Sequence, residues 1–147
     1  MTRILSVDDE PDMLNLLRLV FERAGYEFVG TVSGVEALTM MRTESIDLLT
    51  QDFMRPDQLD GRELLREIKS DASLSAIPVL GVSAGARETR AQQLKSLGLD
   101  FERDLDGYIT KPFSPIELLT AVETILERYG KVIPDEAREL CNPEAWH

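Results

Sequence analysis

Cysteine and histidine are almost absent from this chain of 147 residues. The single cysteine is Cys141, and the single histidine is His147, the last residue of the sequence. One cysteine cannot form a disulfide within the chain, which is typical of proteins from a reducing compartment, and we therefore expect a cytoplasmic location. The lack of any earlier histidine excludes most Ser-His and Cys-His nucleophile chemistry, and also a histidine-based metal site.

Long apolar runs and an excess of positive charge are missing too. The longest stretch without a charged residue ends at Ala86, is interrupted by Pro78 and Gly85, and is too short to cross a bilayer. The N-terminus shows no apolar segment followed by a cleavage site, so we expect no secretory signal. The formal net charge of −11 argues against nucleic acid or an anionic membrane as the main partner, because both favour a basic surface.

Hydrophobic residues make up 43% of the chain and charged residues 29%, a composition that suits one soluble domain with a core of its own. Short apolar segments alternate with segments of helical periodicity five times along the chain. The expected strands are residues 4–7, 27–32, 46–51, 77–82 and 108–110, and the expected helices are residues 12–24, 33–41, 62–70, 87–97 and 114–129. This alternation indicates an α/β fold, with a parallel sheet and helices on both of its faces.

Several residues mark the ends of these helices. Pro11 suits the first turn of the first helix, and Gly25 suits its C-terminal end. Ser33 and Ser114 are each followed by a glutamate three residues later, a pattern that predicts a capping box at both positions.

Two acidic segments fall outside the alternation. Residues 100–106 contain four carboxylates and one arginine, and they lie between the expected fourth helix and fifth strand. Residues 132–147 contain four carboxylates, one arginine and two prolines. We therefore predict one domain at residues 1–131, followed by an acidic C-terminal tail at residues 132–147.

Charged residues follow three of the expected strands at the point where each strand ends. Asp8 and Asp9 follow the first strand, Asp52 follows the third, and Lys111 follows the fifth. In an open parallel α/β sheet, ligands bind at the carboxyl ends of the strands, so these side chains are expected to share one crevice. Clustered carboxylates repel one another unless a cation joins them, and a lysine beside them indicates an anionic ligand as well.

The chemistry of this crevice suits Mg²⁺ and a phosphoryl group. Mg²⁺ prefers oxygen ligands, which Asp8, Asp9, Asp52 and the backbone carbonyl of Met54 would supply. Asp52 is the candidate nucleophile, because carboxylates can form acyl phosphates. Lys111 would pair with one phosphoryl oxygen.

Two further residues are candidates for contact with the phosphoryl group or for a response to it. Ser83, at the end of the fourth expected strand, would donate its hydroxyl to a second phosphoryl oxygen. Tyr108 lies three residues before Lys111, near the edge of the sheet, and would follow a movement of Ser83.

Each of these residues also has an ordinary structural explanation. Asp8 and Asp9 precede a helix, where acidic residues are favoured by the helix dipole. Asp52 alone suits a turn at a strand end, Lys111 alone suits solvent, and Tyr108 alone suits a half-buried sheet position. The combination at successive strand ends, rather than any single member, favours a common site.

Taken together, four motifs resemble the receiver domain of two-component response regulators. They are Val7-Asp8-Asp9-Glu10, then Asp52 with Pro56 and Asp60-Gly61, then the strand ending in Ser83-Ala84, and finally Gly107 to Phe113 with Lys111-Pro112. The resemblance covers roughly residues 2–130. It implies a flavodoxin-like, doubly wound sheet of five parallel strands in the order 2-1-3-4-5.

The resemblance also implies a role for each residue of the crevice. Asp52 would be phosphorylated in a Mg²⁺-dependent reaction, by transfer from a histidine of a sensor histidine kinase or a histidine phosphotransfer protein. Asp8 and Asp9 match the metal-binding acidic pair, and Lys111 matches the phosphate-pairing lysine. Ser83 and Tyr108 match the switch hydroxyl and the switch aromatic residue.

The chain departs from the pattern of this family in four places. Arg55 stands where the family usually has an apolar residue, and one extra residue lies between Asp52 and Asp60-Gly61. The interval from Ser83 to Lys111 is longer than usual by about half a dozen residues, mostly around the acidic residues 100–106. Finally, Met54 and Gly85 occupy positions where side chains often control water access, and neither can orient a water molecule by hydrogen bonding.

The motifs favour a phosphorylatable receiver that acts as a stand-alone signalling module. Too few residues follow the last expected helix for an output domain, so the output would be binding to a downstream protein or relay of the phosphoryl group. Its only catalysis would be its own phosphorylation and slow autodephosphorylation.

An alternative is a receiver-fold binding module that signals without phosphate. A second is an aspartate-nucleophile phosphatase or phosphotransferase, although such enzymes usually carry a second aspartate where this chain has Met54.

Overall fold

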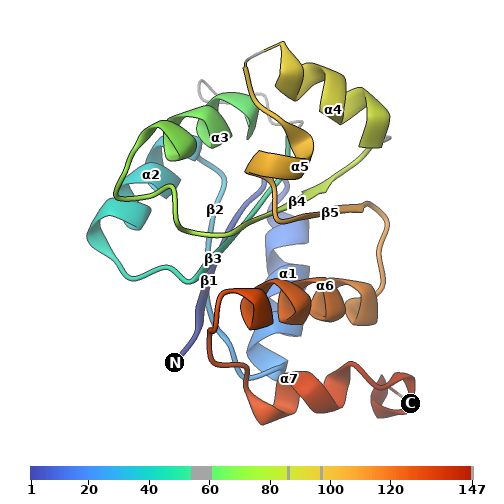
Figure 1. Ribbon diagram of the computed structural model, residues 1–147. Coiled ribbons are helices and arrows are strands. Elements are labelled where there is room, and N and C mark those ends of the chain that lie inside the picture. The colour runs from blue at the N-terminus through green and yellow to red at the C-terminus, as the bar shows by residue number, and fades with distance from the viewer. Residues whose placement is uncertain (54–60, 86, 97, 147) are drawn as a thin grey trace.

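The computed structural model describes residues 1–53, 61–85, 87–96 and 98–146 (Figure 1). Within these residues five strands form one parallel sheet in the order β2-β1-β3-β4-β5, so the predicted flavodoxin-like order is confirmed. The strands are β1 (Arg3–Val7), β2 (Glu27–Thr31), β3 (Leu48–Gln51), β4 (Val79–Ser83) and β5 (Gly107–Thr110). None of the described helices combines the length and the apolar character of a membrane-spanning helix.

Helices connect the strands and cover both faces of the sheet, as Figure 1 shows. They are α1 (Pro11–Arg23), α2 (Gly34–Thr43), α3 (Gly61–Ser70), α4 (Arg87–Lys95), α5 (Phe101–Asp104), α6 (Pro115–Arg128) and α7 (Asp135–Leu140), followed by the short 3₁₀ helix η1 (Pro143–Trp146). Helices α1, α6 and α7 lie on one face, and α2 to α5 lie on the other.

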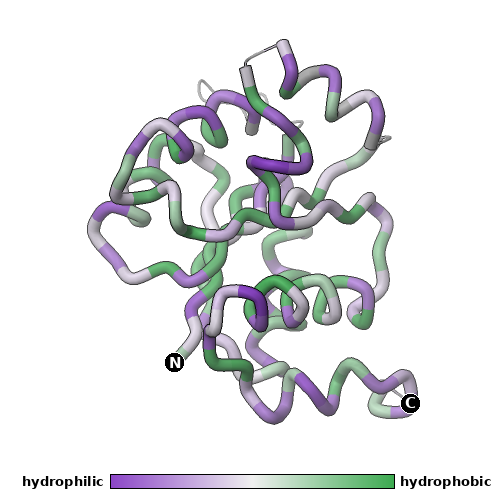
Figure 2. Tube along the Cα trace, viewed as in Figure 1, coloured by the Kyte–Doolittle hydropathy of each residue, from purple (hydrophilic) through white to green (hydrophobic). Residues whose placement is uncertain are grey.

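The core consists of two apolar clusters, one on each face of the sheet. Successive strand residues point to opposite faces, so Ile4 and Leu48 belong to the α1–α6 cluster while Leu5 and Leu49 belong to the α2–α5 cluster. All four of these side chains are fully buried. Figure 2 shows the hydrophobic residues concentrated along the central strands, as expected for a parallel sheet that is covered on both sides.

The helix ends follow the residues that marked them in the sequence. Pro11 opens α1, and Gly25 follows its C-terminal end with a positive φ of 90°, a conformation that glycine adopts without strain. The hydroxyl of Ser114 accepts a hydrogen bond from the backbone of Glu117 and completes the capping box of α6. The hydroxyl of Ser33 accepts a hydrogen bond from the amide of Glu36 and caps α2, but the amide of Ser33 donates to Oγ1 of Thr31, so the capping box predicted there is only half formed.

The boundaries of some elements differ from those expected. The fourth strand begins at Val79 rather than at residue 77, because Pro78 has no N–H group to donate to the sheet. Helix α4 ends at Lys95, and Gly98 follows with a φ of 77°. The acidic residues 100–106, for which no element was expected, contain α5, whose first turn is capped by the side chain of Asp100.

The segment predicted as an acidic tail contributes to the core. Ile133, Ala137 and Leu140 are buried and belong to the α1–α6 cluster. The indole Nε1 of Trp146 donates to the carbonyl of Leu140 at 2.7 Å, and the guanidinium carbon of Arg23 on α1 lies 4.5 Å from the centre of the indole ring. The domain boundary at residue 131 stays a prediction, but the segment beyond it packs against α1 and α6.

Candidate functional site

Backbone hydrogen bonds continue one residue beyond the strand ends and fix the predicted site residues. The amide of Asp52 donates to the carbonyl of Val7 at 3.1 Å, and the amide of Lys111 donates to the carbonyl of Ser83 at 3.1 Å. The amide of Asp8 is held in the same way by the neighbouring strand β2. The sheet therefore presents Asp8, Asp52 and Lys111 together at its carboxyl edge, as the strand pattern predicts.

Four carboxylates gather at this edge. Oxygen atoms of Asp8, Asp9, Glu10 and Asp52 all lie within 4.8 Å of one another. Asp8 and Asp52 are buried, Asp9 is partly buried and Glu10 is exposed. Carboxylate oxygens are the donors that Mg²⁺ prefers, and a small number of them suffices for this ion, so the donor set fits Mg²⁺.

Lys111 lies directly against these carboxylates. Its ammonium nitrogen is 2.7 Å from Oδ2 of Asp8, 3.2 Å from Oδ2 of Asp52 and 3.7 Å from Oε1 of Glu10. Only 12% of the lysine side chain is exposed, so solvent screens these contacts weakly. One ammonium thus offsets part of the negative charge of two buried aspartates.

The surroundings shift the pKa values of Asp8 and Lys111. Burial raises the pKa of Asp8, and the negative charge of Asp52 adds to this effect, although the hydrogen bond from Lys111 opposes it. Burial alone would lower the pKa of Lys111, but the hydrogen bond to Asp8 and the charges of Asp52 and Asp8 outweigh it, so the pKa of Lys111 is raised. The lysine therefore remains a cation at neutral pH.

Ser83 contacts the other oxygen of Asp52. The serine hydroxyl donates to Oδ1 of Asp52 at 2.7 Å, and both side chains are buried. The two oxygens of Asp52 thus have different donors, since Oδ1 faces the hydroxyl of Ser83 and Oδ2 faces the ammonium of Lys111. The predicted contact residues are placed on either side of the candidate nucleophile.

Tyr108 is placed by a hydrogen bond and by contacts with two aromatic rings. Its phenol donates to the carbonyl of Gly85 at 3.3 Å, and its ring contacts the rings of Phe53 and Phe101. Met54, whose backbone carbonyl we expect among the metal ligands, lies outside the described residues. Glu10 was not among the predicted ligands, although its position directly after Asp8-Asp9 is a signal for it.

Comparison with protein families agrees with this geometry. The family model described as "Response regulator receiver domain" matches residues 4–123, which include every strand except the first residue of β1, and the whole carboxylate cluster. The chain belongs to the response regulator receiver domains. The resemblance inferred from the four motifs is therefore confirmed.

Curated relatives of this receiver domain are longer proteins. The alkaline phosphatase synthesis transcriptional regulatory protein PhoP of Bacillus subtilis is 39% identical over 142 residues, which are 97% of this chain and 55% of PhoP. The response regulator SaeR of Staphylococcus aureus is 33% identical over 144 residues, which are 98% of this chain and 59% of SaeR. The chain thus spans a little over half the length of these relatives.

Solved structures confirm the receiver fold. A receiver domain of a Francisella response regulator is 30% identical, with a TM-score of 0.73 over 88% of this chain and 99% of that one. The chemotaxis response regulator CheY4 of Vibrio cholerae is 25% identical, with a TM-score of 0.74 over 86% of this chain and 99% of that one. The receiver domain described here is therefore similar to them over nearly their full length.

Proposed function

We propose that Asp52 accepts a phosphoryl group from a phosphorylated histidine of a sensor histidine kinase or a histidine phosphotransfer protein. A carboxylate oxygen of Asp52 attacks the phosphorus atom, so that an O–P bond forms while the P–N bond breaks. The electron pair of the broken bond stays on the ring nitrogen. The imidazole, already protonated on its other nitrogen, leaves as a neutral ring, and Asp52 becomes an acyl phosphate.

The contacts of Asp52 carry this proposal. Ser83 and Lys111 each donate to a different oxygen of the carboxylate, at 2.7 and 3.2 Å. A phosphoryl group on Asp52 adds acceptor oxygens beside these same two donors, and developing negative charge there is stabilised by the ammonium of Lys111. Both donors are fixed by the strands that carry them, so little reorganisation is needed.

The acidic cluster supports a role for Mg²⁺ in the same reaction. Asp8, Asp9 and Asp52 would hold the ion, with the backbone carbonyl of Met54 as a further ligand, and bound Mg²⁺ would offset the charge of the transferring group. Without a cation, repulsion from Asp8 and Asp9 disfavours the approach of an anionic donor to Asp52. We therefore propose that phosphorylation depends on the metal.

Phosphorylation is tested by intact-mass measurement after incubation with acetyl phosphate. We expect one phosphoryl group per chain in the presence of Mg²⁺, and none when the metal is chelated. The variant Asp52→Asn keeps the size of the side chain but removes the nucleophile, and it should stay unmodified. A wild-type chain without added mass would favour the binding module that signals without phosphate. Repeated turnover of a phosphorylated small molecule would favour an enzyme.

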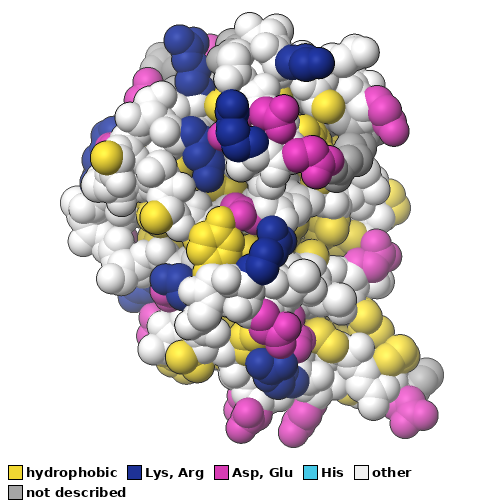
Figure 3. All heavy atoms as spheres, viewed as in Figure 1, with side chains coloured by type: hydrophobic (Ala, Val, Ile, Leu, Met, Phe, Trp, Pro, Cys, Tyr) yellow, Lys and Arg dark blue, Asp and Glu magenta, His cyan; other side chains and the backbone are white. Residues whose placement is uncertain are grey.

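We further propose that the receiver signals through contacts with other proteins. The two longer relatives are named a transcriptional regulatory protein and a response regulator, but this chain carries a net charge of −11, and the face in Figure 3 mixes acidic and basic side chains. Such a surface suits protein partners better than nucleic acid. The stand-alone role, the cytoplasmic location and the restriction of catalysis to its own acyl phosphate stay predictions.

A further inference from the structure

A row of three aromatic rings leads from the acceptor residue to helix α5. Phe53 directly follows Asp52, and its ring stacks on that of Tyr108, with the centroids 6.4 Å apart and the planes at 17°. Tyr108 also contacts Phe101 of α5, with the centroids 5.2 Å apart and the planes at 58°. Phe53 and Phe101 are buried, so water does not separate the rings.

Strand β4 lies directly beneath this row. A Cβ atom at Gly81 would lie 2.8 Å from the ring of Phe53 and 2.8 Å from the ring of Tyr108, so the rings occupy the space that any other residue would fill. The ring of Tyr108 therefore contacts the sheet at Gly81 and the rings of Phe53 and Phe101. Tyr108 itself is partly exposed, and a change in the position of its ring is passed to Phe101 where the two rings are in contact.

Helix α5 is held together by its own polar side chains. The carboxylate of Asp100 accepts a hydrogen bond from the amide of Arg103 at 2.9 Å. Oδ2 of Asp104 accepts one from the amide of Asp100 at 2.7 Å and one from the guanidinium of Arg103 at 2.8 Å. These bonds fix Phe101 to the rest of the helix, so a displaced Phe101 carries α5 with it.

There is space around Phe101 for such a displacement. Phe101 lines a surface hollow of about 260 Å³ together with Ala91 and Leu99, on the side that faces α4. It also lines a second hollow of about 280 Å³ with Leu105 and Arg128. Phe101 is buried in the α2–α5 cluster, but these two hollows border it, so there is room for its ring to shift away from Tyr108.

We propose that Phe101 is a positioning residue that couples Tyr108 to α5, so that a phosphoryl group on Asp52 moves α5 against α4. The coupling depends on the function proposed above, because it needs a phosphoryl group on Asp52, whose neighbour Phe53 begins the row of rings that continues through Tyr108 to Phe101. It assigns a role to residues 100–106, where this chain is longer than usual for its family. Through α5, Tyr108 would act on a part of the surface that no strand of the sheet forms.

The coupling is tested with the full chain, Mg²⁺ and beryllium fluoride, a mimic of the phosphoryl group. Mimic binding to the wild-type chain should increase amide hydrogen exchange in residues 99–105. In Phe101→Leu this exchange should already be raised without the mimic, and the increase on binding should be smaller. The ring contact stabilises the arrangement without phosphate, so its loss should tighten mimic binding by about two- to tenfold, the range of one aromatic pair.

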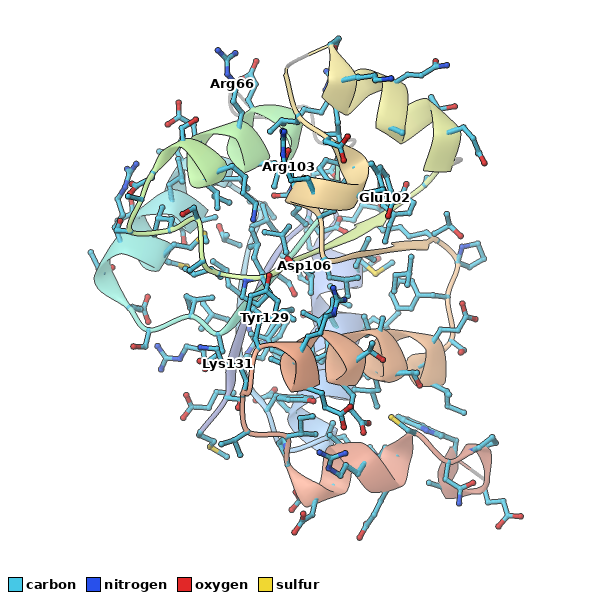
Figure 4. The ribbon with its side chains drawn as sticks, in the orientation of Figure 1. Arg66, Glu102, Arg103, Asp106, Tyr129 and Lys131 are labelled. Carbon is cyan, nitrogen blue, oxygen red and sulfur yellow. The ribbon has the colours of Figure 1, made fainter. Side chains whose placement is uncertain are left out.

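Glu102→Gln is the matched control. Glu102 lies on the same helix, beside Arg103 in Figure 4, and its side chain is exposed, so this variant should behave as the wild type does. Mimic binding without any change of exchange in α5 would overturn the coupling. So would Phe101→Leu with a lower melting temperature but wild-type affinity, because Phe101 would then be structural only. A wild-type chain that does not bind the mimic would refute the proposed function and the coupling together.

Discussion

Lys111 illustrates how one side chain can serve both folding and signalling. Its ammonium group lies between two buried carboxylates, at 2.7 Å from Asp8 and 3.2 Å from Asp52. In the absence of another cation this contact offsets their mutual repulsion. In the proposed acyl phosphate the same ammonium is available to a phosphoryl oxygen, so its contacts in the two states compete. Because these contacts compete, the charge added by a phosphoryl group on Asp52 can change the structure around Lys111.

The variant Lys111→Ala is expected to lose the response to phosphate while keeping the fold. Asp8 has a raised pKa and can take up a proton when the lysine is removed. We therefore expect the free energy of unfolding to fall by less than about 3 kcal/mol, the lower end for breaking a buried pair. Beryllium fluoride with Mg²⁺ should bind much more weakly than to the wild type. A variant that shows no cooperative thermal transition would contradict this and make Lys111 mainly structural.

The ionisation of the Tyr129 phenol can be measured, and this residue is not part of the carboxylate cluster around Asp52. Its phenol donates to Oδ1 of Asp106, and the two side chains lie close together in Figure 4. Partial burial, and then the hydrogen bond and charge of Asp106, raise the pKa of Tyr129 to about 12. An ordinary tyrosine has a pKa of about 10. The contact with Asp106 therefore stabilises the neutral phenol in the folded chain.

The sign of the pH effect follows from this shift. Stability from the Tyr129 contact is complete below about pH 10, where the tyrosine is neutral in the folded and the unfolded chain. It is lost as the pH rises toward about 12, because the unfolded chain ionises first. In Tyr129→Phe, the titration of phenolate absorbance should lack its component near this pKa, and stability should fall less steeply above pH 10. A component that titrates at the ordinary tyrosine pKa and disappears in this variant would contradict the assignment.

Among the elements, the helices with clear caps and periodicity were predictable and the segments rich in charge were not. Pro11 and Ser114 mark the starts of α1 and α6, because both act through local backbone geometry that the sequence displays. Helix α5 has only four residues, too few for a periodic pattern, and its buried Phe101 is surrounded by charges. Helix α7 is likewise short, and its burial depends on long-range contacts with α1 and α6.

The C-terminal segment is expected to unfold together with the rest of the domain. Trp146 is the single tryptophan of the chain and lies in this segment, so its fluorescence reports on the packing of α7 and η1. In urea, the fluorescence transition should coincide with the loss of helical circular dichroism. Leu140→Ala removes a buried side chain at the edge of the core, and it should lower the free energy of unfolding by about 2 kcal/mol.

Glu139→Ala is the control for this variant. Glu139 is exposed on the same helix, and its substitution should change stability by no more than about 0.5 kcal/mol. If Trp146 were already exposed without urea while the dichroism transition stayed unchanged, the segment would not be part of the cooperative unit.

At the scale of the whole molecule, the alternation of strands and helices was sufficient to predict which charged residues meet at the carboxyl edge of the sheet. Parallel strands end on the same side, so residues far apart in the sequence, such as Asp8, Asp52 and Lys111, had to meet there. The distances between them, and which oxygen of Asp52 faces Ser83, depend on the packing of side chains and could not be inferred from spacing. The contact of Tyr108 with Phe101 could not be inferred either, because α5 itself was not expected.

The central claim is that the sheet brings acidic residues together so that Asp52, and no other carboxylate, accepts a phosphoryl group. Reduction of the phosphorylated chain with borohydride converts an acyl phosphate to a stable alcohol, and peptide mass mapping then locates it. We predict that the alcohol appears at residue 52, only when Mg²⁺ was present during phosphorylation. An alcohol at Asp8, at Asp9 or at a surface carboxylate, or no reduced residue at all, would contradict the claim.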